Sequence, residues 1–429
     1  MKKILQIGLI MMLFSPGVLF AGWVRQNSGV SGALRDVHFV DNQNGWCVGD
    51  SGAILRTSNG GSTWVRQTSG TEDTLYGVQF LNAYLGWAVG GNNQAKILKT
   101  TDGGATWTSQ SLSGWPAGLK GISFTSEACG WVTVGWSVPD NGHHVLHTTD
   151  GGSTWSDQRI PPPPWAEVGP LTRIFFKDSL CGWVGGGMWI SPILGVLYQT
   201  TNGGANWTLR YTWMPFRPPP WDYPSFEGLD FSFDTLNGWA CGEGIDENGG
   251  VVDELIIRTR DGSQWTWQYH QIIPQAKGLK DIAACDSLNS WAVGRQGIIL
   301  RTTNGRTWSS YPSGVTADLF GVDFADTGNG WACGSYGVIL KYSSGVGVEE
   351  QTDQRLAVNG QRLSVAPNPF TSSATVFGHP KGRFAVYDIS GRLIRTYHGD
   401  RFGEDLSPGV YFLVPQEKGA KPVRVVKLR

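Results

Sequence analysis

Residues 45–64 read GWCVGDSGAILRTSNGGSTW, and this stretch decides the fold. Two short apolar runs, 45–49 and 53–57, are each followed by Gly, Ser, Asp or Asn, the residues that favour tight turns. The stretch ends in Trp64, whose large ring can anchor a hairpin in a hydrophobic core. The pattern therefore predicts two short strands, a turn and the beginning of a further strand.

The Gly-Trp pair at the start of this stretch recurs along the chain at intervals of 40 to 56 residues. A short apolar alternation precedes each pair, and a further strand and a Gly-rich turn follow most of them. Four short strands per unit is the spacing of a propeller blade. The sequence thus predicts an all-β fold, a seven-bladed β-propeller over residues 22–345. The repeated tryptophans are Trp46, Trp87, Trp131, Trp183, Trp239, Trp331 and, preceded by Ser, Trp291.

The turn at 57–64 recurs at 100–107, 148–155 and 200–207, with altered copies at 259–262 and 302–308. Its third position is always Asp or Asn, which can bond the turn backbone, and the next residue is a Gly that can supply positive φ. One such residue per blade favours a structural role over catalysis or calcium binding. The six residues are Asn59, Asp102, Asp150, Asn202, Asp261 and Asn304.

The two ends of the repeat are expected to meet. The seventh unit stops near residue 345 without a fourth strand, whereas residues 23–29 nearly duplicate the fourth strand at 64–70. We therefore expect residues 23–26 to complete the seventh blade, which would close the ring and leave no exposed sheet edge.

The N-terminus predicts export. Lys2 and Lys3 precede an apolar run that ends in Leu19-Phe20-Ala21, so residues 1–21 read as a signal peptide. No later segment has the run of about 20 apolar residues that a membrane-spanning helix needs, so an integral membrane protein is not expected. The composition, 40% hydrophobic with 60 Gly and 21 Trp, excludes a disordered chain, and a net charge of -1 gives no reason to expect nucleic-acid binding.

The propeller region resembles known families. The turn motif is similar to the Asp box, or bacterial neuraminidase repeat. The seven Gly-Trp strands followed by such turns resemble the photosystem II assembly and stability factor family, and this resemblance implies a binding or assembly role without catalysis. Sialidase activity is not expected, because the nearest match to the Arg-Ile-Pro segment, Arg173-Ile174-Phe175, lacks the proline.

A second domain follows the repeat. Residues 346–361 read as a polar linker, and residues 362–429 alternate strands with Asn-Pro and Ser-Gly turns, which predicts a small β-sandwich. The segments Pro367-Asn368-Pro369, Tyr387-Asp388 and Gly409-Val410-Tyr411 are similar to the C-terminal sorting domain of the type IX secretion system. This resemblance implies that the secretion machinery is a partner through residues 362–429, with release or attachment at the bacterial cell surface.

The six cysteines show no metal-binding spacing, so we expect no metal site and no cofactor. Disulfides are open to an exported chain, but the cysteines fall in different blades, which favours buried free thiols. A basic position also recurs at the end of the third strand, where it either packs between blades or forms a ring for an anionic partner. Its members are Arg56, Lys99, Arg258, Arg301 and Lys341, with His147 and Gln199 in the other two blades.

The third to fifth units are longer because of insertions at 136–144, 161–170, 188–194, 213–225 and 243–254. By strand order these segments share one face of the propeller, and they carry aromatic residues on Pro-rich stretches together with acidic groups. Rigid aromatic anchors beside polar groups suit a glycan or protein site. The candidate ligand-binding residues are Trp136, Trp165, Trp189, Trp213, Trp221, Asp222 and Tyr223.

The resulting hypothesis is an exported, surface-attached β-propeller without catalytic residues, which binds an extracellular glycan or protein through this face. Two alternatives stay open at this point. One is a glycoside hydrolase or lyase that uses two loop carboxylates, and the other is a structural protein of the cell envelope.

Overall fold

The computed structural model divides the chain into two compact units, Met1–Gly347 and Val348–Arg429. The expected signal peptide, 1–21, and the expected linker, 346–361, lie outside the residues that it describes. The described residues are 22–92, 94–110, 112, 115, 118–135, 142–161, 168–188, 194–213, 223–232, 236–245, 251–272 and 276–344 in the first unit, and 364–366, 372–377, 383–388, 393–399, 401–407, 409–415 and 423–427 in the second.

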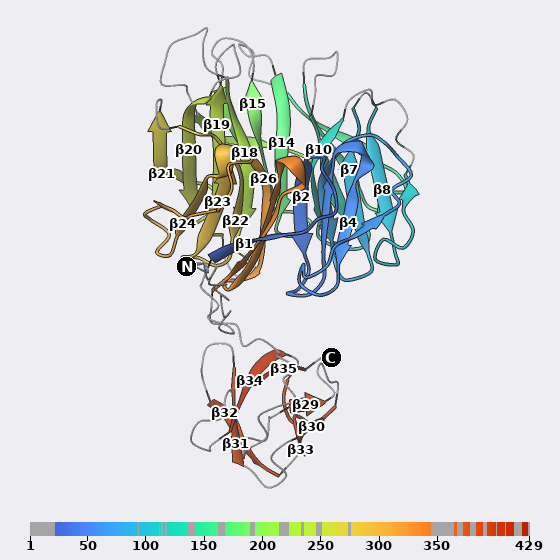
Figure 1. Cartoon of the computed structure of the whole chain (residues 1–429), viewed down its shortest axis with the longest axis vertical. Helices are drawn as coiled ribbons and strands as arrows, with labels where there is room; N and C mark the ends of the chain where they lie inside the picture. The colour runs from blue at the N-terminus through green and yellow to red at the C-terminus, as the bar shows by residue number, and fades with distance from the viewer. Residues whose placement is uncertain are drawn as a thin grey trace, which may run out of the picture. The chain divides into compact units, whose positions relative to one another are not determined.

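The first unit is a β-propeller of seven four-stranded antiparallel sheets (Figure 1). Short 3-10 turns join the second and third strands of blades 1, 6 and 7. From the channel outwards, the strands of the first three blades are β2 (Leu34–Phe39), β3 (Gly45–Gly49), β4 (Ile54–Thr57) and β5 (Val65–Gln67) in blade 1; β6 (Leu75–Phe80), β7 (Gly86–Gly90), β8 (Lys96–Thr100) and β9 (Thr108–Ser109) in blade 2; and β10 (Leu119–Phe124), β11 (Gly130–Val134), β12 (His143–Thr148) and β13 (Ser156–Ile160) in blade 3. The two blades with the long strands contain β14 (Val168–Phe176), β15 (Gly182–Met188), β16 (Leu194–Thr200) and β17 (Thr208–Trp213) in blade 4, and β18 (Tyr223–Phe231), β19 (Gly238–Ile245), β20 (Val251–Thr259) and β21 (Trp265–Ile272) in blade 5. The last two blades contain β22 (Leu279–Ala284), β23 (Ser290–Gly294), β24 (Ile299–Thr302) and β25 (Ser309–Ser310) in blade 6, and β26 (Leu319–Asp326), β27 (Asn329–Gly334), β28 (Ile339–Ser343) and β1 (Gly22–Gln26) in blade 7. The 3-10 turns are η1 (Asp50–Gly52), η2 (Arg295–Gly297) and η3 (Ser335–Gly337).

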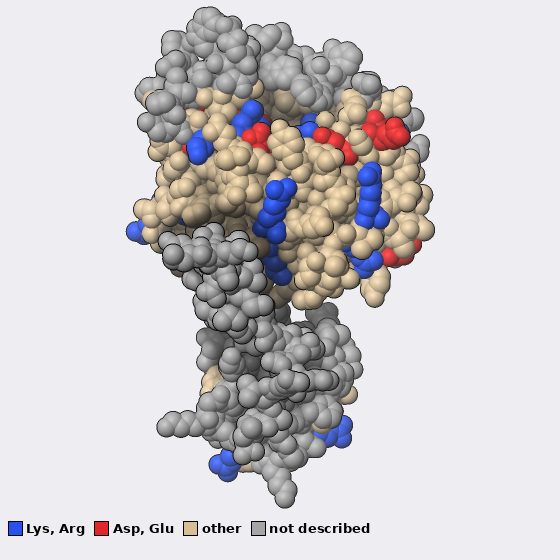
Figure 2. Space-filling model, viewed as in Figure 1, with Lys and Arg blue, Asp and Glu red and all other residues tan. Residues whose placement is uncertain are grey.

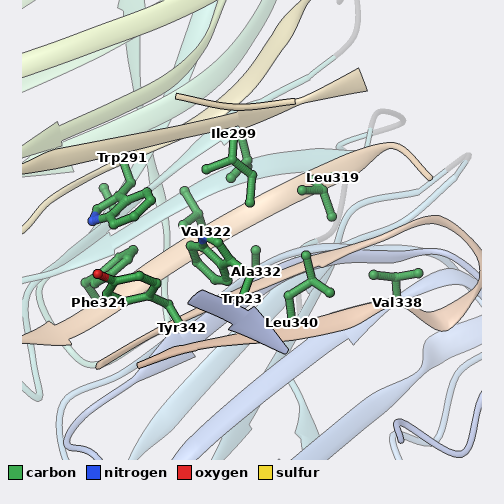
Figure 3. Close-up of a cluster of buried hydrophobic side chains, with 12 residues drawn as sticks. Trp23, Trp291, Ile299, Leu319, Val322, Phe324, Ala332, Val338, Leu340 and Tyr342 are labelled. Atoms are coloured by element: carbon green, nitrogen blue, oxygen red, sulfur yellow. The ribbon is translucent and has the colours of Figure 1, made fainter. Parts of the chain in front are cut away.

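The N-terminal strand is the outermost strand of blade 7. Strand β1 pairs antiparallel with β28, with Gly22 opposite Ser343 and Gln26 opposite Ile339. Trp23 anchors this strand, since its ring meets Trp291 edge-on at 5.6 Å and lies 5.5 Å from Tyr342 (Figure 3). The first and last strands of the propeller therefore share one sheet.

Each repeated tryptophan joins its blade to the next one. The Trp46 ring stacks on Phe80 of blade 2 at 3.5 Å, and its Nε1 donates a hydrogen bond of 3.1 Å to the carbonyl of Gly103 in the turn of blade 2. The glycine before the tryptophan has a steric reason, because a Cβ on Gly45 would overlap the Phe39 ring. The same indole-to-turn bond occurs at Trp87, Trp131, Trp183 and Trp331.

Blades 4 and 5 are taller than the others. Strands β14, β18 and β20 have nine residues each, whereas the inner strands of blades 1, 2, 3 and 6 have six. Part of the inserted sequence therefore extends strands. In particular, residues 251–254, which the sequence places in a connection, belong to β20, and Asp253 and Glu254 are buried.

The second unit contains two small sheets, which pack around a core of Phe384, Val386, Phe402, Leu406, Tyr411 and Leu413. The sheet order is β29-β30-β33 in one and β32-β31-β34-β35 in the other, which agrees with the expected β-sandwich. Its strands are β29 (Ser364–Ala366), β30 (Ala374–Phe377), β31 (Arg383–Asp388), β32 (Leu393–His398), β33 (Arg401–Phe402), β34 (Gly409–Pro415) and β35 (Val423–Lys427).

Candidate functional site

The expected ligand-binding residues lie mainly outside the described part of the chain. This is the case for Trp136, Trp165, Trp189, Trp221 and Asp222, and Tyr223 is the first residue of β18.

Trp213 is described, and its expected place in a loop is wrong. It is the last residue of β17, its side chain is 2% exposed, and its ring lies 5.7 Å from Phe226. Gly195 and Gly242 carry no side chain beside it, so the indole fills the space that they leave. Trp213 is thus a core residue of blades 4 and 5.

The six Asp-box residues bond within their own turns. In blade 2, Asp102 accepts hydrogen bonds from the Thr106 amide at 2.9 Å, the Thr106 hydroxyl at 2.7 Å and the Thr100 hydroxyl at 2.8 Å. These bonds lower the pKa of Asp102 to about 2. Equivalent contacts surround Asn59, Asp150, Asn202, Asp261 and Asn304. The side-chain oxygen atoms of these residues therefore accept hydrogen bonds from their own turns.

The recurring basic position packs on the repeated tryptophans. Lys99 lies 5.3 Å from the Trp87 ring and donates a hydrogen bond of 2.9 Å to the carbonyl of Gly151. Arg56, Arg258, Arg301 and Lys341 each lie over the tryptophan of their own blade, and His147 stacks on Trp131 at 4.7 Å. This arrangement supports the packing interpretation of the series rather than a free basic ring. On the side of the molecule shown in Figure 2, charged residues are scattered over a largely uncharged surface.

A site that the sequence analysis missed lies at one end of the central channel. One residue of each inner strand points to it, the second residue in blades 1, 2, 3, 6 and 7 and the fifth in the longer strands of blades 4 and 5, and these residues differ from blade to blade. They are Arg35, Tyr76, Lys120, Thr172, Glu227, Lys280 and Phe320. Together with Gly135, Pro170, Arg173, Pro224, Ser225, Glu243, Ile245 and Arg295, they line a cavity of about 350 Å³, which we call the channel mouth.

The channel mouth borders four of the five long insertions. Gly135 precedes the insertion at 136–144, Pro170 ends that at 161–170, and Pro224 and Ile245 belong to those at 213–225 and 243–254. Described residues at the ends of four insertions therefore line the channel mouth. An ordinary signal existed in the sequence, because this strand position alternates with buried residues and varies in charge among the seven repeats.

The ion pairs of the channel mouth are concentrated on one side. Glu243 accepts hydrogen bonds from Lys280 at 2.5 Å and from Arg295 at 2.8 and 2.6 Å, so two cationic side chains bind it through three bonds. In blade 1, Arg35 pairs with Asp50 at 2.9 Å.

Lys120 lies between these two groups, with its Nζ 3.2 Å from the centre of the Tyr76 ring. Burial lowers the pKa of Lys120 to about 8. The charge of Glu227 opposes this shift, whereas three surrounding cations, Arg35, Arg173 and Lys280, add to it. The ammonium of Lys120 therefore sits in a partly desolvated and positively charged neighbourhood.

Arg173 forms the floor of the channel mouth. Its side chain crosses from blade 4 to bond Asp281 of blade 6 at 3.3 Å and the carbonyl of Phe320 of blade 7 at 3.4 Å. Burial raises the pKa of the neighbouring Asp36 to about 7. Four of the seven inner strands have glycine at this level, which leaves room for the guanidinium; they are Gly77, Gly121, Gly228 and Gly321.

Polar residues below this floor tie the blades together. Asp230 accepts a hydrogen bond of 2.8 Å from the amide of Ala284 in the next blade, Asp323 accepts one of 2.6 Å from Phe39, and Ser123 accepts one of 2.9 Å from Phe176. These hydrogen bonds show that the carboxylates at this level link neighbouring inner strands.

Within the described part of the chain, no group of His, Cys, Asp and Glu side chains has the arrangement of a metal site. The same residues include no helix long and apolar enough to cross a membrane.

The comparisons with known proteins agree with this architecture. The model of the family described as photosynthesis system II assembly factor YCF48 matches residues 66–212 and 245–343. No curated protein matches the chain. The solved structure of YCF48 bound to D1 peptide is 19% identical, with a TM-score of 0.55, and the match covers 76% of this chain and 99% of that one.

Two further solved structures share the fold. Inactive virginiamycin B lyase from Staphylococcus aureus, with quinupristin, is 16% identical with a TM-score of 0.56, and the match covers 75% of this chain and 98% of that one. PorZ, a surface component of the type IX secretion system of Porphyromonas gingivalis, is 13% identical with a TM-score of 0.52; the match covers 96% of this chain and 61% of PorZ. At these identities the matches show the fold alone.

Proposed function

Since the chain belongs to the photosynthesis system II assembly factor YCF48 family, we propose that it is a binding protein without catalytic activity, and that its channel mouth holds an anionic segment of a partner protein. The observation that carries this proposal is the charge of the lining, with five cationic side chains and two carboxylates. When Asp50 and the buried Asp281, the partners of Arg35 and Arg173, are counted as well, the cations still exceed these four carboxylates by one.

The shape of the site supports an extended segment rather than a large flat interface. A cavity of about 350 Å³ is at the lower end of the range for small ligands and accommodates one or two side chains. Tyr76, Phe320 and Pro224 supply apolar contacts beside the cations, and Arg guanidinium groups can bind carboxylates in a bidentate manner. The YCF48 structure with a bound D1 peptide provides a precedent for peptide binding in this family.

We further propose that the protein is exported and acts at the cell surface. The expected signal peptide at 1–21 and the resemblance of residues 362–429 to a type IX sorting domain support this location. The likeness of the fold to PorZ, a surface component of that secretion system, is in keeping with it. The secretion machinery would then be a transient partner of the second unit.

An enzymatic alternative has one observation in its favour. Glu227 and Glu243 both line the channel mouth, and Lys280 lies 4.0 and 2.5 Å from them. Retaining and inverting glycosidases need one carboxyl group that can donate a proton. Lys280 and Arg295 already donate three hydrogen bonds to Glu243, and this engagement of its oxygen atoms favours a binding role over proton transfer to a substrate.

Calorimetric titration of the mature protein tests the binding proposal. The probes are a short peptide rich in Asp and Glu, a basic peptide of equal length, and an oligogalacturonate. We expect the acidic peptide to bind and the basic one not to bind. Lys120→Met should weaken binding by about 10- to 150-fold, because a charge-assisted bond contributes about 1.5–3 kcal/mol.

Lys99→Met is the matched control, since Lys99 packs on Trp87 away from the channel mouth and its loss should leave the affinity unchanged. Equal affinity of the wild type and Lys120→Met for the acidic peptide would refute the site. Binding of the oligogalacturonate alone would replace the protein partner with an acidic glycan, and release of shorter sugars from it would establish the enzymatic alternative.

A further inference from the structure

The seven interfaces between blades share one repeated pair of positions. Positions in the second strand are counted here from the Gly of the Gly-Trp pair, or from its Ser variant. The fourth residue of one blade belongs to the same interface as the third residue of the next blade. The shared hydrophobic clusters place five of these pairs together. In order around the ring the pairs are Val48 with Ala88, Val89 with Val132, Thr133 with Val184, Gly185 with Ala240, Cys241 with Ala292, Val293 with Ala332, and Cys333 with Cys47.

Only the interface between blades 7 and 1 has cysteine at both positions. Cys47 and Cys333 are fully buried and belong to one core cluster with Leu55, Trp331 and Ile339. Burial raises the pKa of the Cys333 thiol well above its usual range, and a hydrogen bond with the Cys47 thiol raises it further. The two thiols therefore lie in one core cluster, close enough for Cys47 to influence the Cys333 thiol.

Cys241 provides an internal comparison. It occupies the same strand position as Cys333, is equally buried, and faces Ala292 instead of a second cysteine. A small apolar residue thus satisfies the packing of the facing position, as Ala88 and Ala332 also show. Packing explains a cysteine at either position alone, but it gives no reason for cysteines to coincide at the interface where the ring closes.

We propose that Cys47 and Cys333 are a redox site, at which a disulfide covalently links the first and last blades. The expectation of six free thiols would then hold for four of them, although none of the six is bonded in the present structure. The site lies at the interface between the first and the last blade, which come from opposite ends of the propeller sequence. A bond there would therefore restrain nearly the whole propeller.

The oxidant that the reaction needs is a disulfide of a small molecule or of a thiol oxidoreductase. One cysteine thiolate attacks a sulfur of that disulfide and releases one thiol, and the second cysteine then attacks the mixed disulfide and releases the other. Two S–H bonds and the S–S bond of the oxidant are broken, the Cys47–Cys333 bond is formed, and two electrons and two protons end on the released thiols. Because both thiols are buried in the folded ring, the exchange takes place before this interface closes.

Refolding of the mature chain tests the proposal. The protein is unfolded with reductant and refolded either in oxidised and reduced glutathione or in reductant alone, and free thiols are then counted in denaturant. We expect four free thiols after the first treatment and six after the second. Trypsin should release residues 36–56 joined to residues 307–341 from the oxidised protein, since each of these peptides contains one cysteine.

The oxidised form should melt about 5 °C above the reduced form, because a cross-link between distant residues restricts the unfolded chain. Cys241→Ala, the matched control, should keep this difference, whereas Cys47→Ala should lose it. Six free thiols after oxidative refolding, or a different linked pair of peptides, would overturn the proposal. The peptide mapping uses the wild-type chain, so it decides the matter even where a variant does not fold.

Discussion

The two ends of the propeller differ in how they use a repeated position. At the Asp-box end, the third residue of the turn is Asp or Asn in six blades, and its contacts stay inside one turn. At the channel mouth, the equivalent residue of each inner strand is Arg, Tyr, Lys, Thr, Glu, Lys or Phe, and its contacts reach other blades. A position that keeps its chemistry stabilises each blade, whereas a position that varies is free to build a single site.

The largest effect is expected at the uniform positions. Trp46→Ala removes a ring that is fully buried, stacks on Phe80 and bonds the turn of blade 2, so it should lower the free energy of unfolding by about 3–5 kcal/mol. Urea denaturation measures this loss. Trp267→Ala is the control, because that side chain is 61% exposed and its removal should cost about 1 kcal/mol or less. Equal losses in the two variants would show that the repeated tryptophans do not hold the blades together.

A smaller effect is expected at the channel mouth, and only on binding. The pKa of Lys120 is lowered to about 8, so its positive charge disappears as the pH rises through that value. The affinity for an acidic peptide should therefore fall between about pH 7 and pH 9, by no more than the loss that Lys120→Met causes at neutral pH.

Lys120→Arg separates this titration from a general loss of structure. An arginine keeps its charge at these pH values, so its affinity should stay level over the same interval, measured by calorimetry with circular dichroism as a check on folding. A decline of equal size in Lys120→Arg would place the titrating group elsewhere.

The sequence predicted the elements that repeat and failed where a unit departs from the others. Six Gly-Trp pairs and one Ser-Trp pair were enough to predict the blades, because all seven tryptophans are buried and five of them bond the turn of the next blade. Trp213 was assigned to a loop because its unit is long, but the added residues extend β16 and β17 into a taller hairpin, where the indole becomes buried beside Gly195 and Gly242.

The channel mouth was missed for a different reason. Its lining comes from all seven units, and no two neighbouring units supply the same side chain, so a search for recurring motifs passes over it. Periodicity tells which residues face the channel, but the pairing of Lys280 with Glu243, or of Arg173 with Asp281, depends on which blades lie opposite each other. That information exists only in the closed ring.

The smallest effect concerns acid stability at the Asp-box end. Hydrogen bonds in the turns lower the pKa values of Asp102, Asp150 and Asp261 to about 2. A lowered folded-state pKa means that the unfolded chain binds protons first as the pH falls. The stability that these turns contribute is therefore complete above about pH 4 and is lost towards pH 2.

The natural asparagines Asn59, Asn202 and Asn304 make comparable turns without a titrating group, so a triple Asp→Asn variant should keep the fold. Its melting temperature should change less between pH 5 and pH 2.5 than that of the wild type, as measured by differential scanning calorimetry. The three turns are exposed and each shift is moderate, so the difference should amount to a few degrees at most. If the two proteins show an identical pH dependence, the charge of these carboxylates does not stabilise the turns. Asp and Asn would then be interchangeable at this position, as neutral hydrogen-bond acceptors.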